Sequence, residues 1–243
     1  MSRTIQTLIL AVAALSASPA DSLCDEAARL FFNRHLAPGN LDSAYQLLAG
    51  VRTSDPRNEQ CLYLWSRLHV QLGDLAATGA AKLELYARAR AVAETLRAVN
   101  DANPEGHMWW VAAHGRIGQT RGVMNSLFMV PTIKRELSRV LELDPRHATA
   151  CDAFGVLYYE LPGIVGGNLR KSEEYLVRGL NIDPNYTLLR LDLARVYVRQ
   201  RRWPEAREQL DALCATIRPT FPADFELDDR PEALRLLTEI RDR

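Results

Sequence analysis

Residues 186–218 read YTLLRLDLARVYVRQRRWPEAREQLDALCATIR, and this stretch shows the pattern that decides the fold. Apolar or small side chains recur three and four residues apart in both of its halves, as they do on one face of an α-helix. They are Leu193, Ala194 and Tyr197 in the first half, and Ala206, Leu210 and Leu213 in the second. Two helices cross closely only where small residues lie at the contact, and Ala194 and Ala206 supply them. We therefore expect this stretch to form a helical hairpin.

The same pattern recurs along the chain. Its marker is an Asp-Pro or Asn-Pro pair, found at Pro56, Pro104, Pro145 and Pro184. Consecutive pairs are 48, 41 and 39 residues apart, a spacing typical of stacked helical hairpins. A leucine lies eight residues before each proline, at Leu48, Leu96, Leu137 and Leu176. Repeat packing requires these leucines and Leu210 to be buried at equivalent places.

These repeats resemble the tetratricopeptide repeat, a helix–turn–helix unit of roughly 34 residues. We predict an all-α solenoid of about five helix pairs, without strands, that occupies residues 21–243 as a single domain. An amphipathic pattern over residues 228–241 predicts a helix that caps the last repeat. The second helices of the second and third repeats are long, over residues 75–100 and 121–143. Pro131 predicts a kink or a break in the later one.

The N-terminus has the features of a targeting segment. Arg3 precedes a short apolar run over residues 8–15, and small residues follow it up to Ala20. This order is typical of a secretory signal peptide, so we predict a signal peptide at residues 1–20 and a periplasmic or secreted protein. The alternative is an uncleaved helix that packs on the domain. Leu23 and Asp21 do not fit a lipoprotein signal ahead of Cys24, and no later segment is long and apolar enough for stable membrane insertion.

Export would place the four cysteines in a compartment where disulfides form. Cys24 and Cys61 both lie near the start of an expected helix, which makes them the candidate disulfide pair. Cys151 and Cys214 lie in apolar helical patterns, and we expect them to be buried as small apolar side chains. No Cys-x-x-Cys motif is present, so a cysteine-based metal or redox motif has no support.

Residues 115–134 and 157–167 are more specific than the generic repeat. They read GRIGQTRGVMNSLFMVPTIK and LYYELPGIVGG. Together with the repeats over residues 58–217, they resemble exported proteins related to the T component of TRAP-type transporters. They are also similar to the repeat domain of regulator of microtubule dynamics proteins. The first resemblance implies a periplasmic scaffold that assists a solute-binding protein, and it leaves a homo-oligomer open.

No pattern in the sequence points to an enzyme, a metal site or a cofactor. Zinc-binding histidine spacing, a phosphate-binding loop and a nucleophile elbow are all missing. Lys and Arg total 30 and Asp and Glu total 30, so no overall charge favours nucleic acid. The hydrophobic content of 47% excludes an intrinsically disordered chain. We therefore expect a non-enzymatic protein that binds a protein partner.

The candidate binding residues lie where the repeats depart from minimal length. Insertions in solenoids often flank the binding face, and tryptophan and arginine are common anchors at interfaces. The candidates are Trp109, Trp110, Arg116, Arg121, Gly163, Gly166 and Gly167. The alternative is that the tryptophans fill a wider hairpin core and that the glycines only turn the chain. Two functions remain open: a scaffold that binds a partner or peptide on its concave face, and an accessory that relays a small solute in a TRAP-type uptake system.

Overall fold

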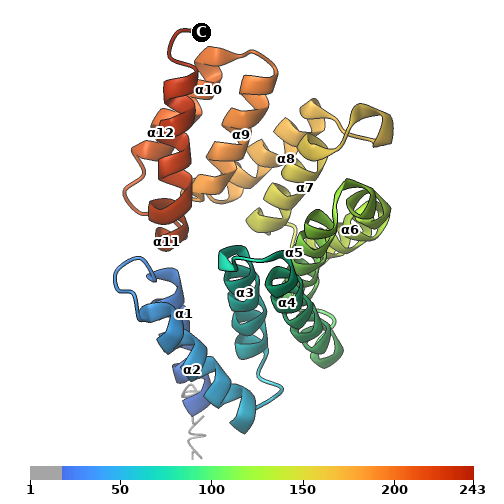
Figure 1. The fold of residues 1–243 in the computed structure, drawn as a ribbon, viewed down its shortest axis with the longest axis vertical. Helices are drawn as coiled ribbons and strands as arrows, with labels where there is room; N and C mark the ends of the chain where they lie inside the picture. Colours follow the sequence, from blue (N-terminus) through green and yellow to red (C-terminus); the bar gives the residue numbers. More distant parts are fainter. Residues whose placement is uncertain (1–17) are drawn as a thin grey trace, which may run out of the picture.

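The computed structural model describes residues 18–243 as an all-helical array. Most of the predicted signal peptide therefore lies outside the described residues. Five antiparallel pairs follow one another along the chain and curve into an arc (Figure 1). The pairs are α1 (Pro19–Phe32) with α2 (Asn40–Ser54), α3 (Glu59–Leu75) with α4 (Gly79–Val99), α5 (Pro104–Arg121) with α6 (Val123–Leu143), α7 (Ala148–Glu160) with α8 (Leu169–Ile182), and α9 (Thr187–Arg199) with α10 (Trp203–Cys214). The described part of the chain contains no strand, and the predicted fold is confirmed.

The repeated leucines form the spine of the core. Each of them has a fully buried side chain with 0% exposure: Leu48, Leu96, Leu137, Leu176 and Leu210. This burial confirms the register that the prolines set, because equivalent positions in successive hairpins face the same layer. Where the two helices of a pair cross, one of them has a small residue at the contact. A Cβ placed on Gly155 of α7 would lie 2.5 Å from Leu176 Cγ on α8.

The long helices of the second and third repeats are α4 and α6. Pro131 lies inside α6, and the helix continues through it from Val123 to Leu143. Of the two predicted outcomes, a kink or a break, the break is therefore wrong. The turn between α5 and α6 consists of Gly122 alone, which has a φ of +101°. Only glycine adopts this conformation without strain, which accounts for such a tight connection.

The first described helix begins at Pro19, two residues before the predicted mature N-terminus. Ser18 accepts a hydrogen bond from the backbone N–H of Asp21, whose carboxylate accepts one from the Ser18 N–H. This capping box fixes the start of α1. Cys24 of α1 and Cys61 of α3 are buried free thiols, and a hydrogen bond with Cys61 lowers the pKa of the Cys24 thiol. The predicted pairing partners are thus neighbours, without a disulfide bond between them.

The C-terminal cap is more elaborate than the single predicted helix. α12 runs from Arg230 to Glu239, and it follows a short helix, α11 (Pro222–Asp224), and a π-helical turn, η2 (Phe225–Asp229). Leu236 and Ile240 are buried against the last repeat. The cap also reaches the opposite end of the chain, because α11 contacts α1 (Figure 1).

Three charged side chains hold the two ends of the array together. Arg34, next to α1, and Arg67 of α3 both donate to the carboxylate of Asp224, at 2.6 Å and 3.3 Å. The rings of Phe32 and Phe221 lie 5.5 Å apart beside them. Because these contacts join the first and last helices, the arc closes on itself and encloses a groove. Over residues 18–243, we find no helix long and apolar enough to cross a bilayer.

Candidate functional site

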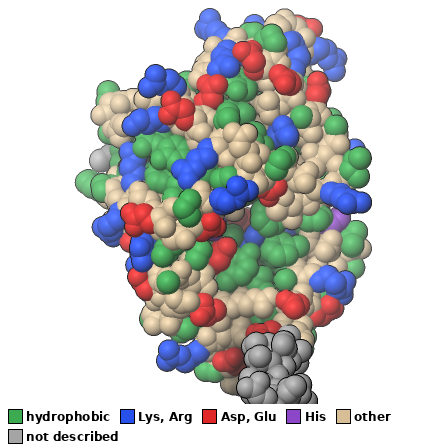
Figure 2. Space-filling model, turned by 180° about the vertical axis from the view of Figure 1, so that it is seen from behind, with side chains coloured by type: hydrophobic (Ala, Val, Ile, Leu, Met, Phe, Trp, Pro, Cys, Tyr) green, Lys and Arg blue, Asp and Glu red, His purple; other side chains and the backbone are tan. Residues whose placement is uncertain are grey.

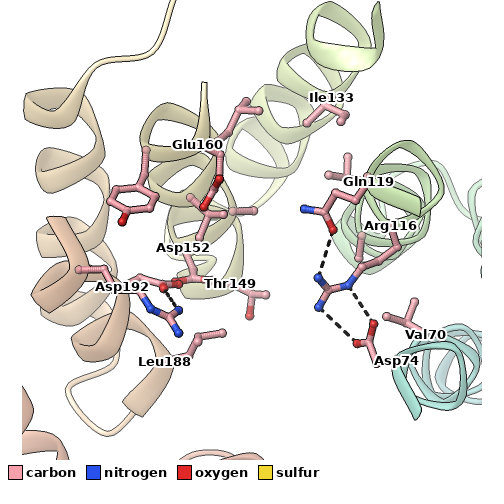
Figure 3. Close-up of a pocket in the computed structure, with 18 of the residues that line it drawn as sticks. Val70, Asp74, Arg116, Gln119, Ile133, Thr149, Asp152, Glu160, Leu188 and Asp192 are labelled. Atoms are coloured by element: carbon pink, nitrogen blue, oxygen red, sulfur yellow. Dashed lines mark hydrogen bonds and ion pairs between the residues drawn. The ribbon is translucent and has the colours of Figure 1, made fainter. Parts of the chain in front are cut away.

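The inner side of the arc is a groove with a volume of about 1210 Å³. It is lined by side chains from every repeat from α3 onward and from the C-terminal cap. On the face seen in Figure 2, apolar side chains gather in a hollow near the middle of the molecule, with acidic side chains beside it. The groove has two chemically distinct walls, which face each other in Figure 3.

The first wall, called here the apolar wall, is built by α3 and α5. Its lining includes Val70, Met108, Trp109 and Val111, of which Trp109 is partly exposed while the other three are buried at 4–7% exposure. Met108 and Val111 are three residues apart and lie on one face of α5, with Trp109 beside them and Val70 on α3. The Trp109 indole N–H donates to Glu105 Oε2 at 2.9 Å, which orients the ring.

One ion pair marks the edge of the apolar wall. Arg116 Nε lies 3.1 Å from Asp74 Oδ1, and Arg116 also donates to the side-chain oxygen of Gln119 at 3.3 Å (Figure 3). Tyr86 donates its hydroxyl to the same Asp74 carboxylate at 2.7 Å. The guanidinium is therefore held over the groove by two side chains while remaining partly exposed.

The second wall, called here the acidic wall, contains three buried carboxyl groups. They are Asp152 of α7, Asp192 of α9 and Asp229 at the end of η2, with exposures of 6%, 8% and 4%. Asp192 accepts from Arg195 at 2.7 Å, and Asp229 accepts from the Thr187 hydroxyl at 2.6 Å. Among the described residues, Asp152 has no ion-pair or hydrogen-bond partner for its Oδ1 atom.

Burial changes the protonation of this wall. Desolvation, reinforced by the charge of Asp192, raises the pKa of Asp152 well above its usual range. Burial also raises the pKa of Asp229 to about 7, against the lowering effect of the Thr187 hydrogen bond. The pKa of Asp192 is raised by burial as well, and Arg195 opposes that rise. At neutral pH the acidic wall therefore holds protons that a cation would displace.

Two of the seven candidate residues from the sequence line the groove, Trp109 and Arg116. Trp110 is next to Trp109 but about 100° further round the helix, so it points toward α4, where its N–H donates to Glu94 and its ring stacks on His114. Of the two adjacent candidates, Trp109 is therefore the one that lines the groove.

The other candidates also lie away from the groove lining. Arg121 is exposed at the end of α5, and Gly163, Gly166 and Gly167 belong to an exposed turn between α7 and α8. Gly166 has a φ of +97°, and a Cβ on Gly167 would collide with the Leu161 carbonyl oxygen. The backbone of this turn therefore requires glycine at positions 166 and 167.

Sequence reasoning missed the acidic wall. Asp152 and Asp192 each interrupt an apolar helical stretch, ATACDAFGV and LLRLDLARV, near the start of the first helix of a repeat. A carboxylate flanked on both sides by apolar residues is the signal that could have found them, because such a residue faces the interior of the array. No group of His, Cys, Asp and Glu side chains in residues 18–243 has the arrangement of a metal site.

The fold and the groove define the class: a tetratricopeptide-repeat solenoid with a closed, lined concave face. Residues 167–217 match a tetratricopeptide-repeat model. The solved structure of TTC0263, a thermophilic tetratricopeptide-repeat protein from Thermus thermophilus, is similar with a TM-score of 0.65 and 19% identity, over 88% of this chain and 99% of that one. Pseudomonas aeruginosa pilF is similar with a TM-score of 0.52 and 15% identity, over 92% of this chain and 95% of that one. At these identities the likeness concerns the fold alone.

The family follows from the sequence. Residues 26–164, more than half of the chain, match the model for regulator of microtubule dynamics protein 1-3. Regulator of microtubule dynamics protein 1 from Bos taurus is 23% identical over 224 residues, which cover 84% of this chain and 68% of that protein. The Pongo abelii protein is 22% identical over 224 residues, which cover 84% and 69%. The chain belongs to the regulator of microtubule dynamics protein 1-3 family.

Proposed function

We propose that this protein is a non-enzymatic scaffold that binds an extended or helical segment of a partner protein in the groove. The observation that carries the proposal is the groove itself, with about 1210 Å³ of space between an apolar wall and an acidic wall. A pocket for a small ligand is generally about 300–1,000 Å³, so this groove has room for a longer ligand. The apolar wall would supply the contact area, and the fixed polar groups would set orientation.

A selection from displayed random peptides tests this proposal without a known partner. The purified chain is the bait, and enriched peptides are measured against the wild type and against Val111→Glu, which places a charge on the apolar wall. We expect at least tenfold weaker binding by the folded variant. Leu234→Glu is the matched control, because Leu234 is an exposed leucine on α12 that does not line the groove. An equal loss of peptide affinity in Val111→Glu and Leu234→Glu, or a selection that enriches no peptide, would contradict groove binding.

We also propose that the protein is exported. Arg3, the apolar run at residues 8–15 and the small residues before Asp21 support this proposal. An oxidising compartment would then join the neighbouring thiols of Cys24 and Cys61. Mass spectrometry of the protein isolated from its native compartment tests both points. Export predicts an N-terminus near Asp21 and a mass two hydrogens lower for the linked pair, and an intact Met1 would refute it.

The identity of the partner divides into two proposals. The resemblance of residues 115–134 and 157–167 to T components supports a periplasmic solute-binding protein of a TRAP-type system, with the relay of a small solute as the finer alternative. Family membership supports instead a microtubule-associated role, since the named relatives are regulators of microtubule dynamics. Co-sedimentation of the purified chain with microtubules, against binding to a purified solute-binding protein, separates them. A positive result in one assay and a negative one in the other selects the partner.

A further inference from the structure

We infer that the partner segment carries an Arg or Lys side chain, which enters the acidic wall and pairs with the carboxyl groups of Asp152 and Asp192. This inference rests on the proposed function, and it names the chemistry that the groove selects. It is carried by an unpartnered buried oxygen, by the charge balance of the groove and by the place where the unmatched charge lies.

The first observation is the unsatisfied oxygen. Asp152 is 6% exposed, lines the groove and is labelled in Figure 3 on the side opposite Arg116. No N–H or hydroxyl group of the described residues donates to its Oδ1 atom, and the hydrogen bond that its side chain makes is with the carboxyl group of Asp192. A buried polar atom without a partner costs free energy, and native proteins retain few of them. A donor from a bound ligand would satisfy this atom.

The second observation is the charge balance. The net charge of the whole chain is zero, yet the groove is lined by eight carboxylates and four guanidinium groups. The carboxylates are Asp74, Asp152, Glu160, Asp192, Asp224, Asp228, Asp229 and Glu232, and the guanidinium groups are Arg67, Arg116, Arg195 and Arg235. No lysine of the described chain lines it. The concave face therefore has twice as many acidic as basic side chains, which favours a cationic segment over an acidic one.

The third observation is where the negative excess lies. Arg116 pairs with Asp74, Arg67 with Asp224, Arg195 with Asp192 and Glu232, and Arg235 with Glu232. Of the carboxylates in the groove, Asp152, Glu160 and Asp229 form no ion pair with any described residue. All three belong to the side of the groove formed by α7 and η2, so the carboxyl groups without a cationic partner lie together in one part of the groove.

The chemistry of this position favours a guanidinium or ammonium group over other ligands. A cation beside Asp152 and Asp192 would take the place of the proton that burial keeps on the pair. Arg195 already accompanies Asp192 at 2.7 Å, so one further cation completes the wall without an excess of positive charge. Apolar residues flanking that cation in the partner would then cover Val111 and Trp109 across the groove.

The test uses the peptides enriched by display on the full chain, in a double-mutant cycle. One partner of the cycle is Asp152→Asn, which keeps the shape of the side chain and removes its charge. The other is replacement of the peptide's Arg by citrulline, which is neutral and nearly isosteric. We expect each change alone to weaken binding about tenfold or more, and the two together to weaken it little further, because both remove the same interaction. Asp211→Asn is the matched control, since Asp211 is an exposed carboxylate of α10 away from the groove.

The possible results are distinct. Enrichment of peptides that lack Arg and Lys, with binding lost in Val111→Glu but unchanged in Asp152→Asn, would overturn this inference and leave groove binding intact. Additive losses in the cycle would overturn it as well, because the cation would then pair elsewhere. If no peptide is enriched, the proposed function itself fails. The citrulline measurement needs only wild-type protein, so the inference remains testable even if Asp152→Asn does not fold.

Discussion

The two walls of the groove differ in the side chains that they offer to a partner. The apolar wall presents Val70, Trp109 and Val111, and its one ion pair, Arg116 with Asp74, is 46% and 33% exposed. The acidic wall buries Asp152 and Asp192 almost completely. Exposed ion pairs contribute little free energy, whereas buried charges respond strongly to the presence or absence of a counter-ion. The apolar wall therefore provides contact area, and the acidic wall would select a partner segment that carries a cationic side chain.

This difference also explains the architecture around each wall. The apolar wall is carried by the two longest hairpins, whose second helices α4 and α6 are 21 residues each. The acidic wall is carried by shorter repeats and by the cap, with Asp229 supplied by the π-helical turn η2. Since the cap contacts α1, a change at η2 affects both the acidic wall and the closure of the arc.

The largest expected effect is on the free energy of unfolding, when the core that supports the acidic wall loses a buried side chain. Leu176→Ala removes a fully buried side chain that packs against Gly155, one turn from Asp152. The cavity left behind should lower the free energy of unfolding by roughly 2–5 kcal/mol. Thermal or urea unfolding measures it, with the neighbouring Val177→Ala, 37% exposed, as the control expected to cost much less. Equal costs for the two would contradict the repeat register.

A second prediction concerns the pH dependence of stability that Asp229 of the acidic wall causes. The pKa of Asp229 is about 7 in the folded protein against roughly 3.9 in an unfolded chain, so the folded state binds the extra proton. Stability from this group is fully present below about pH 4 and is lost as the pH rises through 7. Asp229→Asn should therefore gain stability relative to the wild type over that window, by roughly 2–4 kcal/mol in total. If the difference in the free energy of unfolding between the wild type and Asp229→Asn does not change with pH, the raised pKa of Asp229 is refuted.

Glu232, also in the groove, supplies the control of opposite sign. Hydrogen bonds from Arg235 and Arg195 lower the pKa of Glu232 to about 2. Its contribution to stability is present above its unfolded pKa and is lost as the pH falls toward 2. As the pH rises from about 2 to neutral, Glu232→Gln should become less stable relative to the wild type, whereas Asp229→Asn should become more stable relative to it. Urea unfolding at several pH values measures both variants.

The repeat architecture could be predicted from sequence because it depends on spacing. Five leucines at equivalent positions, such as Leu137 and Leu176, identify hairpins without knowledge of how the array curves. The groove could be predicted only in part. Trp109 was found because tryptophan is an unusual residue, but which of Trp109 and Trp110 faces inward depends on a rotation of about 100° that the pattern left open.

The acidic wall could not be predicted from the spacing of residues in the sequence, and the reason is physical. Asp152, Asp192 and Asp229 are separated by about 40 residues in sequence, and they meet only when three different elements pack together. The closure of the arc is similar, since Arg34 and Asp224 are 190 residues apart. Contacts of this kind follow from the curvature of the whole solenoid, which small changes in every repeat determine.

A third prediction separates the two adjacent tryptophans. Trp109→Ala removes part of the apolar wall, so the folded variant should bind groove-selected peptides about tenfold more weakly. Trp110→Ala changes the packing on α4 instead and should leave the affinity of the folded protein within about twofold. Isothermal titration, carried out below the melting temperature of each variant, measures the affinities. If the two variants lose affinity equally, the apolar wall is not the contact surface.

The smallest expected effect concerns Arg116. Its ion pair with Asp74 is partly exposed, so Arg116→Ala should change the free energy of unfolding by less than about 1 kcal/mol. Arg121→Ala is a suitable comparison on the same helix, because Arg121 is exposed and lies outside the groove lining. Chemical denaturation of both variants measures the difference. A loss of several kcal/mol in Arg116→Ala would mean that the pair is part of the core rather than of the groove surface.

Whether one ligand contacts both walls of the groove is tested most directly by NMR mapping with an isotope-labelled full chain. A peptide selected by display is titrated into the protein, and backbone amide shifts are followed. We expect the largest shifts on the groove-facing residues of α3, α5, α7 and α9, on both sides of the groove at the same peptide concentration. Shifts confined to α4 and α10, which contribute no residue to the groove lining, or to one wall alone, would contradict a ligand that spans the groove.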